Sequence, residues 1–251
     1  MRRIPRHMGF LKKIMAAVGV GAARVDTRLD SPRVRVGDDV HGVVQVRGGQ
    51  VEQQVERISV GLATRYRHDD SFVTHTLQRE AVVPGFVIRP GESHEFPFGL
   101  RVMPGTPLSL PGTEVWLFTD ADIAGGVDPG DQDALQVLPS AEMETVIGAA
   151  QRLGFTLKGA ETEFAHGRLI QELSFLPPRG QTHLTELELV MLPAPGGLDV
   201  MLEVDRRARG LASFLTSEFE SRGRWVVPTA ALRRGPDALA PDLAARIREL
   251  S

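Results

Sequence analysis

Two runs of alternating apolar and polar residues, joined by a proline-rich loop at 103–112, constrain the fold of this chain most. Side chains alternate between the two faces of a strand, so both runs predict β-strands with one face in a core. In the first run the core-facing residues are Phe96, Phe98, Leu100 and Val102. In the second they are Val115, Leu117 and Thr119, with Trp116 and Phe118 on the opposite face. Pro97 lacks a backbone donor, which places the first strand at a sheet edge or a bulge.

Similar runs recur along most of the chain. Residues 40–47, 55–66 and 71–83 are separated by turn signals, and further runs follow between 155 and 207 and at 225–228. In the run at 184–191 the pattern predicts Leu187 and Leu189 inward and Glu186, Glu188 and Val190 outward. In the first half, strands at this spacing without intervening helical patterns predict an all-β sandwich rather than βαβ units.

Helical patterns are confined to short segments. At 142–154, Met143, Val146 and Ile147 share one helical face, and a second short helix is expected within 205–222. Near the end, Leu243 and Ile247 predict an amphipathic helix with Pro241 in its first turn.

The N-terminal segment 1–23 supports two interpretations. A basic front, a short apolar run and small residues at 21–23 outline a signal peptide. The apolar run is interrupted by glycines, however, and read as a helix it places Phe10 and Ile14 on one face beside Lys12 and Lys13. We favour this amphipathic helix, packed on the body, a membrane or a partner. Met8 offers an alternative start, which makes residues 1–7 an extension.

Charge and composition exclude several classes of function. The formal net charge is -3, whereas a nucleic-acid-binding protein shows a basic excess, so we expect no nucleic-acid partner. The chain has no cysteine, which excludes disulfides, zinc–thiolate sites and thiol nucleophiles and fits a reducing cytosol. The histidines occur singly, and no HExxH, GxSxG or P-loop motif is present. We therefore predict no catalytic residue and no cofactor.

The candidate metal site is the aspartate- and glycine-rich segment 120–133. Its carboxylates are Asp120, Asp122, Asp128, Asp131 and Asp133. Calcium requires several carboxylates that converge on one point, and this spacing does not match an EF-hand loop. The glycines and Pro129 suit a solvated loop equally well, so we favour a plain loop without a metal.

Two groups of residues are candidates for contacts with partners. The first comprises Phe10, Lys12, Lys13 and Ile14. The second comprises Arg206, Arg207 and Arg209. A basic group of this kind can meet an acidic protein or anionic lipid head groups. Charge runs are also commonly solvated faces, so neither group decides the function.

Three longer motifs carry a family resemblance. They are MGFLKKIMAAVGVGAARVDTRLD at 8–30, ADIAGGVDPGDQDALQVLP at 121–139 and EVDRRARGLASFL at 203–215. Together they resemble the bacterial sporulation-control protein family usually called SpoOM, over about residues 8–228. The FPF and GTEVWLF runs also look like the N-terminal sandwich of arrestin-like proteins.

The resemblance implies an all-β protein of two tandem arrestin-like β-sandwich domains with short N-terminal and C-terminal helices. We expect an extension and amphipathic helix at 1–23, sandwiches at 24–140 and 141–230, and a C-terminal helix at 231–251. It further implies a non-catalytic cytoplasmic regulator or scaffold that acts through protein–protein contacts, with partners still to be identified.

Other functions remain open at this point. One is a peripheral membrane-associated binding protein that uses the basic N-terminal helix. A more remote one is a metal-dependent hydrolase with a site assembled from distant strands. Self-association through a strand edge and a weak membrane-surface contact are further candidate interactions.

Overall fold

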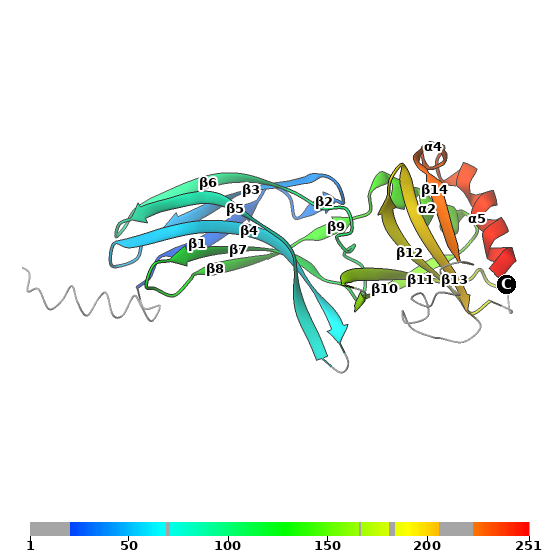
Figure 1. Cartoon of the computed structure of the whole chain (residues 1–251), viewed down its shortest axis with the longest axis horizontal. Coiled ribbons are helices and arrows are strands. Elements are labelled where there is room, and N and C mark those ends of the chain that lie inside the picture. The colour runs from blue at the N-terminus through cyan, green and yellow to red at the C-terminus, as the bar shows by residue number, and fades with distance from the viewer. Residues whose placement is uncertain (1–20, 69–70, 166, 181–183, 206–222, 251) are drawn as a thin grey trace, which may run out of the picture.

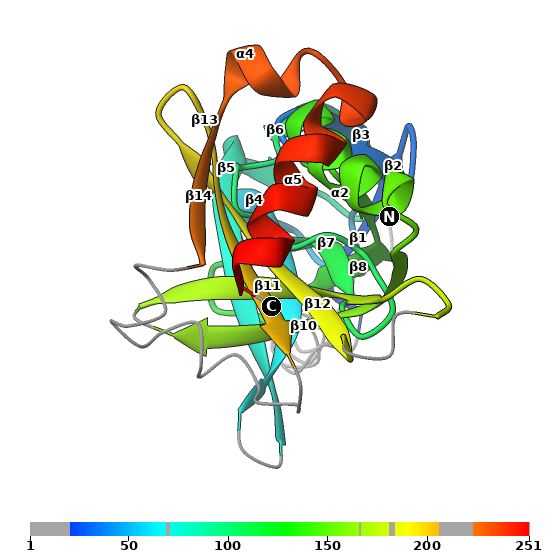
Figure 2. The same cartoon turned by 90° about the vertical axis from the view of Figure 1, so that its right-hand side faces the viewer.

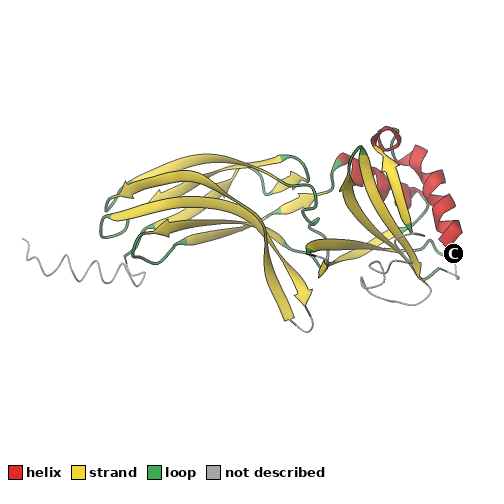
Figure 3. Ribbon diagram, in the orientation of Figure 1, coloured by secondary structure: helices red, strands yellow, loops and turns green. Residues whose placement is uncertain are grey.

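The structure is a computed structural model that describes residues 21–68, 71–165, 167–180, 184–205 and 223–250. Within these residues the chain forms two units that lie end to end along the long axis (Figure 1). In the described ranges, strands dominate both units and helices are confined to the second (Figure 3). The all-β prediction is therefore confirmed.

The first unit is a sandwich of two antiparallel sheets. One sheet has the order β1-β3-β6 and the other the order β5-β4-β7-β8, while β2 and β9 form a short parallel pair. The strands are β1 (Arg24–Leu29), β2 (Arg33–Arg35), β3 (Asp39–Arg47), β4 (Gln53–His68), β5 (Ser71–Ile88), β6 (Ser93–Arg101), β7 (Val115–Ile123), β8 (Gly130–Ala134) and β9 (Gln136–Leu138). Their inward faces supply the core, in which Val44, Leu62, Leu100 and Leu117 are fully buried.

The two strands of the 89–123 segment lie in different sheets. β6 pairs with β3 and is the edge strand of its three-stranded sheet, as Pro97 predicts. β7 lies inside the four-stranded sheet between β4 and β8. The proline-rich loop at 103–112 therefore carries the chain across the sandwich, and the period-2 pattern gives the correct inward face in both strands.

Side chains bridge the two sheets where the strands of the sandwich meet. At one side, the Thr27 N–H of β1 donates to Asp131 Oδ2 of β8 at 2.7 Å. At the other, Gln78 of β5 donates to the Arg101 carbonyl at 2.7 Å and accepts from the Met103 N–H at 3.1 Å. These bonds satisfy backbone groups that the ladders leave unpaired, so they blunt the exposed edges.

The second unit is a five-stranded antiparallel sheet with the order β10-β11-β12-β13-β14. Its strands are β10 (Thr156–Ala165), β11 (Arg168–Leu176), β12 (Glu186–Ala194), β13 (Gly197–Asp205) and β14 (Arg224–Pro228). Its helices are α2 (Ala141–Arg152), α4 (Thr229–Leu232) and α5 (Pro236–Leu250). α2 and α5 pack together across one face of the sheet (Figure 2). Among the described residues, the layer opposite the sheet is thus helical rather than a second sheet.

Local signals fix both long helices. Ser140 caps α2, because its Oγ accepts from the Met143 N–H at 3.2 Å, and the predicted face of α2 is buried. The predicted start of the last helix is wrong: α5 begins at Pro236, and Pro241 lies inside it. Proline is favoured in a first turn because its missing donor is not needed there, and Pro236 takes that place.

The second sheet is buried on part of its other face too. Glu188 and Val190, predicted to point outward, are buried at 6% and 0% exposure, so that prediction is wrong for both. Val190 forms a small apolar cluster with Ile170 and Met201 on this face. Burial, together with the neighbouring glutamates led by Glu188, raises the pKa of Glu172 to about 8.

The proline-rich loop also joins the two units. Gln171 of β11 accepts from the Leu108 N–H at 2.8 Å and donates to the Leu108 carbonyl at 2.9 Å and to Thr113 Oγ1 at 3.2 Å. The Ala160 N–H of β10 donates to the Pro111 carbonyl at 3.0 Å. The loop therefore runs beside the edge of the second sheet and satisfies part of its backbone.

Candidate interaction surface

The predicted partner contacts lie outside the described residues. Phe10, Lys12, Lys13 and Ile14 fall in segment 1–20, and Arg206, Arg207 and Arg209 fall in segment 206–222. Among the helices that the structure describes, none combines the length and apolar character needed to cross a bilayer.

The structure separates the five aspartates of the candidate metal site. The expected loop at 120–133 is wrong for four of them, because Asp120 and Asp122 lie in β7 and Asp131 and Asp133 in β8. In the β7–β8 register, Asp131 pairs with Thr119 and Asp133 with Leu117, which face the core. The two aspartates of β7 therefore point away from the two of β8. No group of three or more metal-ligating side chains occurs in the part of the chain that is described.

Most of these carboxylates have protein partners. Asp120 and Asp122 form ion pairs with Arg79 and Arg57, while Asp128 Oδ1 accepts from the Ile123 N–H at 2.8 Å. Partial burial raises the pKa of Asp120, and the Arg79 guanidinium opposes that shift. Burial also raises the pKa of Asp133, with smaller contributions from the charges of Asp131 and Asp26.

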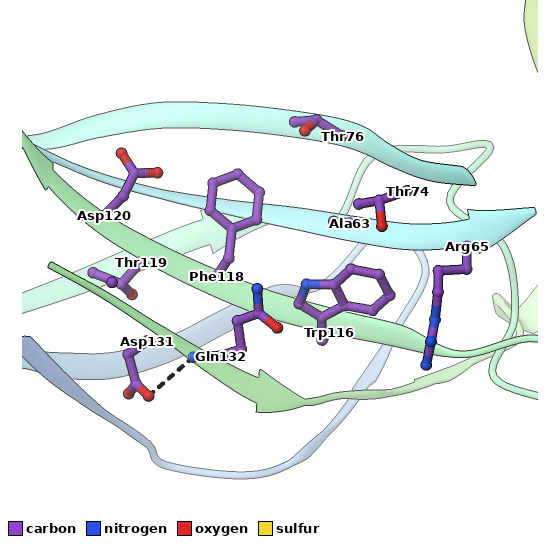
Figure 4. Close-up of a pocket in the computed structure, with 11 residues that line it drawn as sticks. Ala63, Arg65, Thr74, Thr76, Trp116, Phe118, Thr119, Asp120, Asp131 and Gln132 are labelled. Atoms are coloured by element: carbon purple, nitrogen blue, oxygen red, sulfur yellow. Dashed lines mark hydrogen bonds between the residues drawn. The ribbon is translucent and has the colours of Figure 1, made fainter. Parts of the chain in front are cut away.

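The outer face of the four-stranded sheet forms an open trough of about 800 Å³ (Figure 4). Half-buried Trp116 and Phe118 of β7 project into it side by side. The other lining residues are Ala63 and Arg65 of β4, Thr74 and Thr76 of β5, Thr119 and Asp120 of β7, and Gly130, Asp131 and Gln132 of β8. We call this hollow the trough.

Small residues on β4 keep the floor of the trough low. In the strand register Gly61 lies opposite Phe118 and Ala63 opposite Trp116. A Cβ atom on Gly61 would lie 2.4 Å from the Phe118 ring and 2.4 Å from the Gln78 carbonyl oxygen, so glycine is required there. The aromatic rings thus stand above a floor of small side chains.

Arg65 closes one end of the trough. Its guanidinium carbon lies 5.8 Å from the centroid of the Trp116 ring, and the group also forms an ion pair with Glu114. The ion pair is solvent-exposed, so it contributes little to stability. The ring contact and the charge pair do orient the guanidinium at the rim, where a ligand can reach it.

The trough suits non-covalent binding. Its lining combines two aromatic faces, threonine hydroxyls, an amide and charges of both signs. Among these, tryptophan and arginine belong to the residue types that contribute most of the binding energy in protein interfaces. The lining residues include no histidine or lysine that could act as a general base for a neighbouring hydroxyl group.

The sequence contains a signal for this surface outside the catalytic and metal-binding motifs. The alternation in 115–119 already places Trp116 and Phe118 on the face away from the core. Two adjacent large aromatics on the solvent face of a strand are unusual and mark a surface for contact. Arg65 and the threonines of β5 could not be assigned to the same site, because their positions depend on strand order.

Comparison with known proteins supplies the family. A family model described as SpoOM protein matches residues 11–208, within the span that the sequence motifs suggest. The sporulation-control protein spo0M of Bacillus subtilis (strain 168) is 40% identical over 219 residues, which cover 83% of this chain and 85% of the relative. The crystal structure of Spo0M from Bacillus subtilis matches with a TM-score of 0.81 and 32% identity, over 92% of this chain and 100% of that one. The chain therefore belongs to the SpoOM family of sporulation-control proteins.

Proposed function

We propose that this protein is a non-catalytic regulatory protein of the cytoplasm that acts by binding other proteins, and that the trough is its contact surface. The observation that carries the proposal is the pair Trp116 and Phe118, which stand half-buried on the outer face of a sheet. When a partner covers this aromatic pair, apolar surface is removed from water. That burial stabilises the complex by about 25 cal/mol per Å² of apolar area.

The surroundings of the pair favour a protein partner. Arg65 at the rim and Asp120 within the trough offer charges of opposite sign at separate positions. Thr74, Thr76 and Gln132 offer hydrogen-bond donors and acceptors between them. An aromatic centre with a polar, charged rim is the usual anatomy of a protein interface.

A capture experiment from the native host tests the proposal. The tagged full chain is used as bait, and co-purified proteins are identified by mass spectrometry for wild type, Trp116→Ala and Leu176→Ala. Leu176 is the matched control, because it is an apolar side chain with 45% exposure on β11, away from the trough. We expect Trp116→Ala to lose specific partners by about tenfold or more, since central aromatic residues are worth about 2 kcal/mol or more at interfaces. Identical partner sets for wild type and Trp116→Ala would refute the proposal.

Two further expectations concern partners. Self-association through a strand edge stays a prediction. The bridges at Asp131 and Gln78 occupy two sides of the sandwich, so the edge strand β14 of the second sheet is the best candidate for pairing with a second copy. A role in sporulation itself is a property of the named Bacillus relative, and we propose for this chain the broader regulatory role.

A further inference from the structure

Beyond Thr64, strands β4 and β5 continue without the rest of their sheet. The pairing of β4 with β7 ends where Thr64 lies opposite Val115, whereas its pairing with β5 continues to His68 opposite Ser71. Residues 64–68 and 71–75 therefore form a two-stranded ribbon that projects from the sandwich beside the second unit (Figure 1). An isolated two-stranded hairpin is only marginally stable in water, so contacts with other elements are needed to hold the ribbon in place.

Aromatic contacts with the second unit supply that support. β4 lies beside β10, and Phe164 near the end of β10 contacts both strands of the ribbon. Its ring centroid lies 5.8 Å from that of Tyr66 and 5.2 Å from that of His75. Tyr66 and His75 also contact each other edge-on at 6.1 Å. Ring pairs at such distances contribute about 0.5–1.5 kcal/mol each beyond the area that they bury.

The two faces of the ribbon have different neighbours. Tyr66 and His75 face Phe164. Arg65 and Thr74, which lie opposite each other in the register, line the trough. Successive side chains of a strand point to opposite faces, so the same short stretch of backbone carries both sets of contacts.

We propose that the ribbon is a latch that fixes the angle between the two units by holding Phe164. Relative motion is the default for two units in one chain unless the interface between them is large and apolar. Here the ribbon adds a point of attachment, apart from the loop at 103–112 that Gln171 holds and from the exposed Arg35–Glu144 ion pair between β2 and α2. The latch does not depend on a partner in the trough, so it goes beyond the proposed function.

Paired spin labels measure the angle directly. Because the chain has no cysteine, Ser93→Cys in the first unit and Asp242→Cys in the second give one labelled pair. Both side chains are exposed, and neither has a hydrogen bond or ion pair among the interactions described. Double electron–electron resonance then reports the distribution of distances between the two units in the full chain.

In this background we expect Phe164→Ala to widen the distance distribution about twofold, because unlatched units move relative to each other. Leu176→Ala is the matched control: Leu176 is 45% exposed, against 41% for Phe164, and lies on the same sheet away from the ribbon. Its distribution should equal that of the parent. Equal broadening in both variants would overturn the latch, since the effect would then not be specific to the ribbon contact.

A second variant approaches the same contact from the first unit. Tyr66→Ala removes the ring that Phe164 meets on β4 and leaves the second sheet intact. We expect it to widen the distribution by less than Phe164→Ala does, because Phe164 keeps its contact with His75. The double variant should match Phe164→Ala, because that single change already removes the Tyr66 contact. An unchanged distribution in either single variant, in protein with wild-type circular dichroism, would overturn the proposal.

Discussion

Replacing Gln171 with methionine should destabilise the whole protein, although the side chain is only partly buried. The change keeps the length of the side chain and removes three hydrogen bonds, two to the backbone of Leu108 and one to Thr113. Leu108 is 2% exposed, so water does not readily replace the lost partners. At about 1 kcal/mol for each bond, the expected loss is about 3 kcal/mol.

The two tryptophans allow this loss to be followed in each unit. Trp116 lies in the first unit and Trp225 in the second, and the chain has no other tryptophan. Urea unfolding is recorded by fluorescence in a Trp225→Phe and in a Trp116→Phe background, each with and without Gln171→Met. We expect a lower midpoint in both backgrounds, because Gln171 belongs to the second unit and Leu108 to the first. In a thermal scan the same loss corresponds to a fall in Tm of about 6–12 °C for a chain of this size.

Gln132→Met is the matched control for this experiment. Gln132 is exposed on β8, and no hydrogen bond of its side chain is among those described. Its substitution should change stability by less than about 0.5 kcal/mol, as surface substitutions usually do. The reasoning is refuted if Gln171→Met also stays within that range in both backgrounds.

Two further predictions concern the second unit. The pKa of Glu172 is raised to about 8 by burial and then by neighbouring glutamates, so between about pH 4.5 and 8 the folded state binds more protons than the unfolded state. The free energy of unfolding should therefore fall as the pH rises through that window. Glu172→Gln should flatten the pH dependence of the urea midpoint. A midpoint equally dependent on pH in Glu172→Gln would contradict this assignment. Ser140→Ala should cost about 1 kcal/mol in urea unfolding, because it removes the N-cap of α2, whereas Ser140→Asp, which retains a capping oxygen, should retain most of that stability.

Period-2 alternation predicted the strands of this protein well, because one face of most strands is buried. The inward faces of β6 and β7 follow from Phe98, Leu100 and Leu117 alone. Alternation could not predict which strands pair, and so it missed that β6 and β7 lie in different sheets. The pattern of Glu188 and Val190 misled because both faces of β12 are buried at that point, which removes the usual contrast between inside and outside.

The candidate site was harder to predict for a related reason. The sequence predicts one loop at 120–133, yet four of its aspartates lie on two neighbouring strands, β7 and β8, and point to opposite faces of the sheet. The trough in turn combines β4, β5, β7 and β8, which strand order alone brings together. Trp116 and Phe118 were visible in the sequence as an outward-facing pair, but not the residues that surround them.

The route of the loop at 103–112 has a consequence for how this chain can be divided. A protein cut after Leu138 would retain every strand of the first sandwich, yet Leu108 and Pro111 would lose their partners Gln171 and Ala160. A fragment that starts at Ala141 would expose the backbone of β10 along the edge where the loop now lies. Each half therefore carries a surface that only the other completes. The two halves should therefore be more stable in the full chain than as separate fragments.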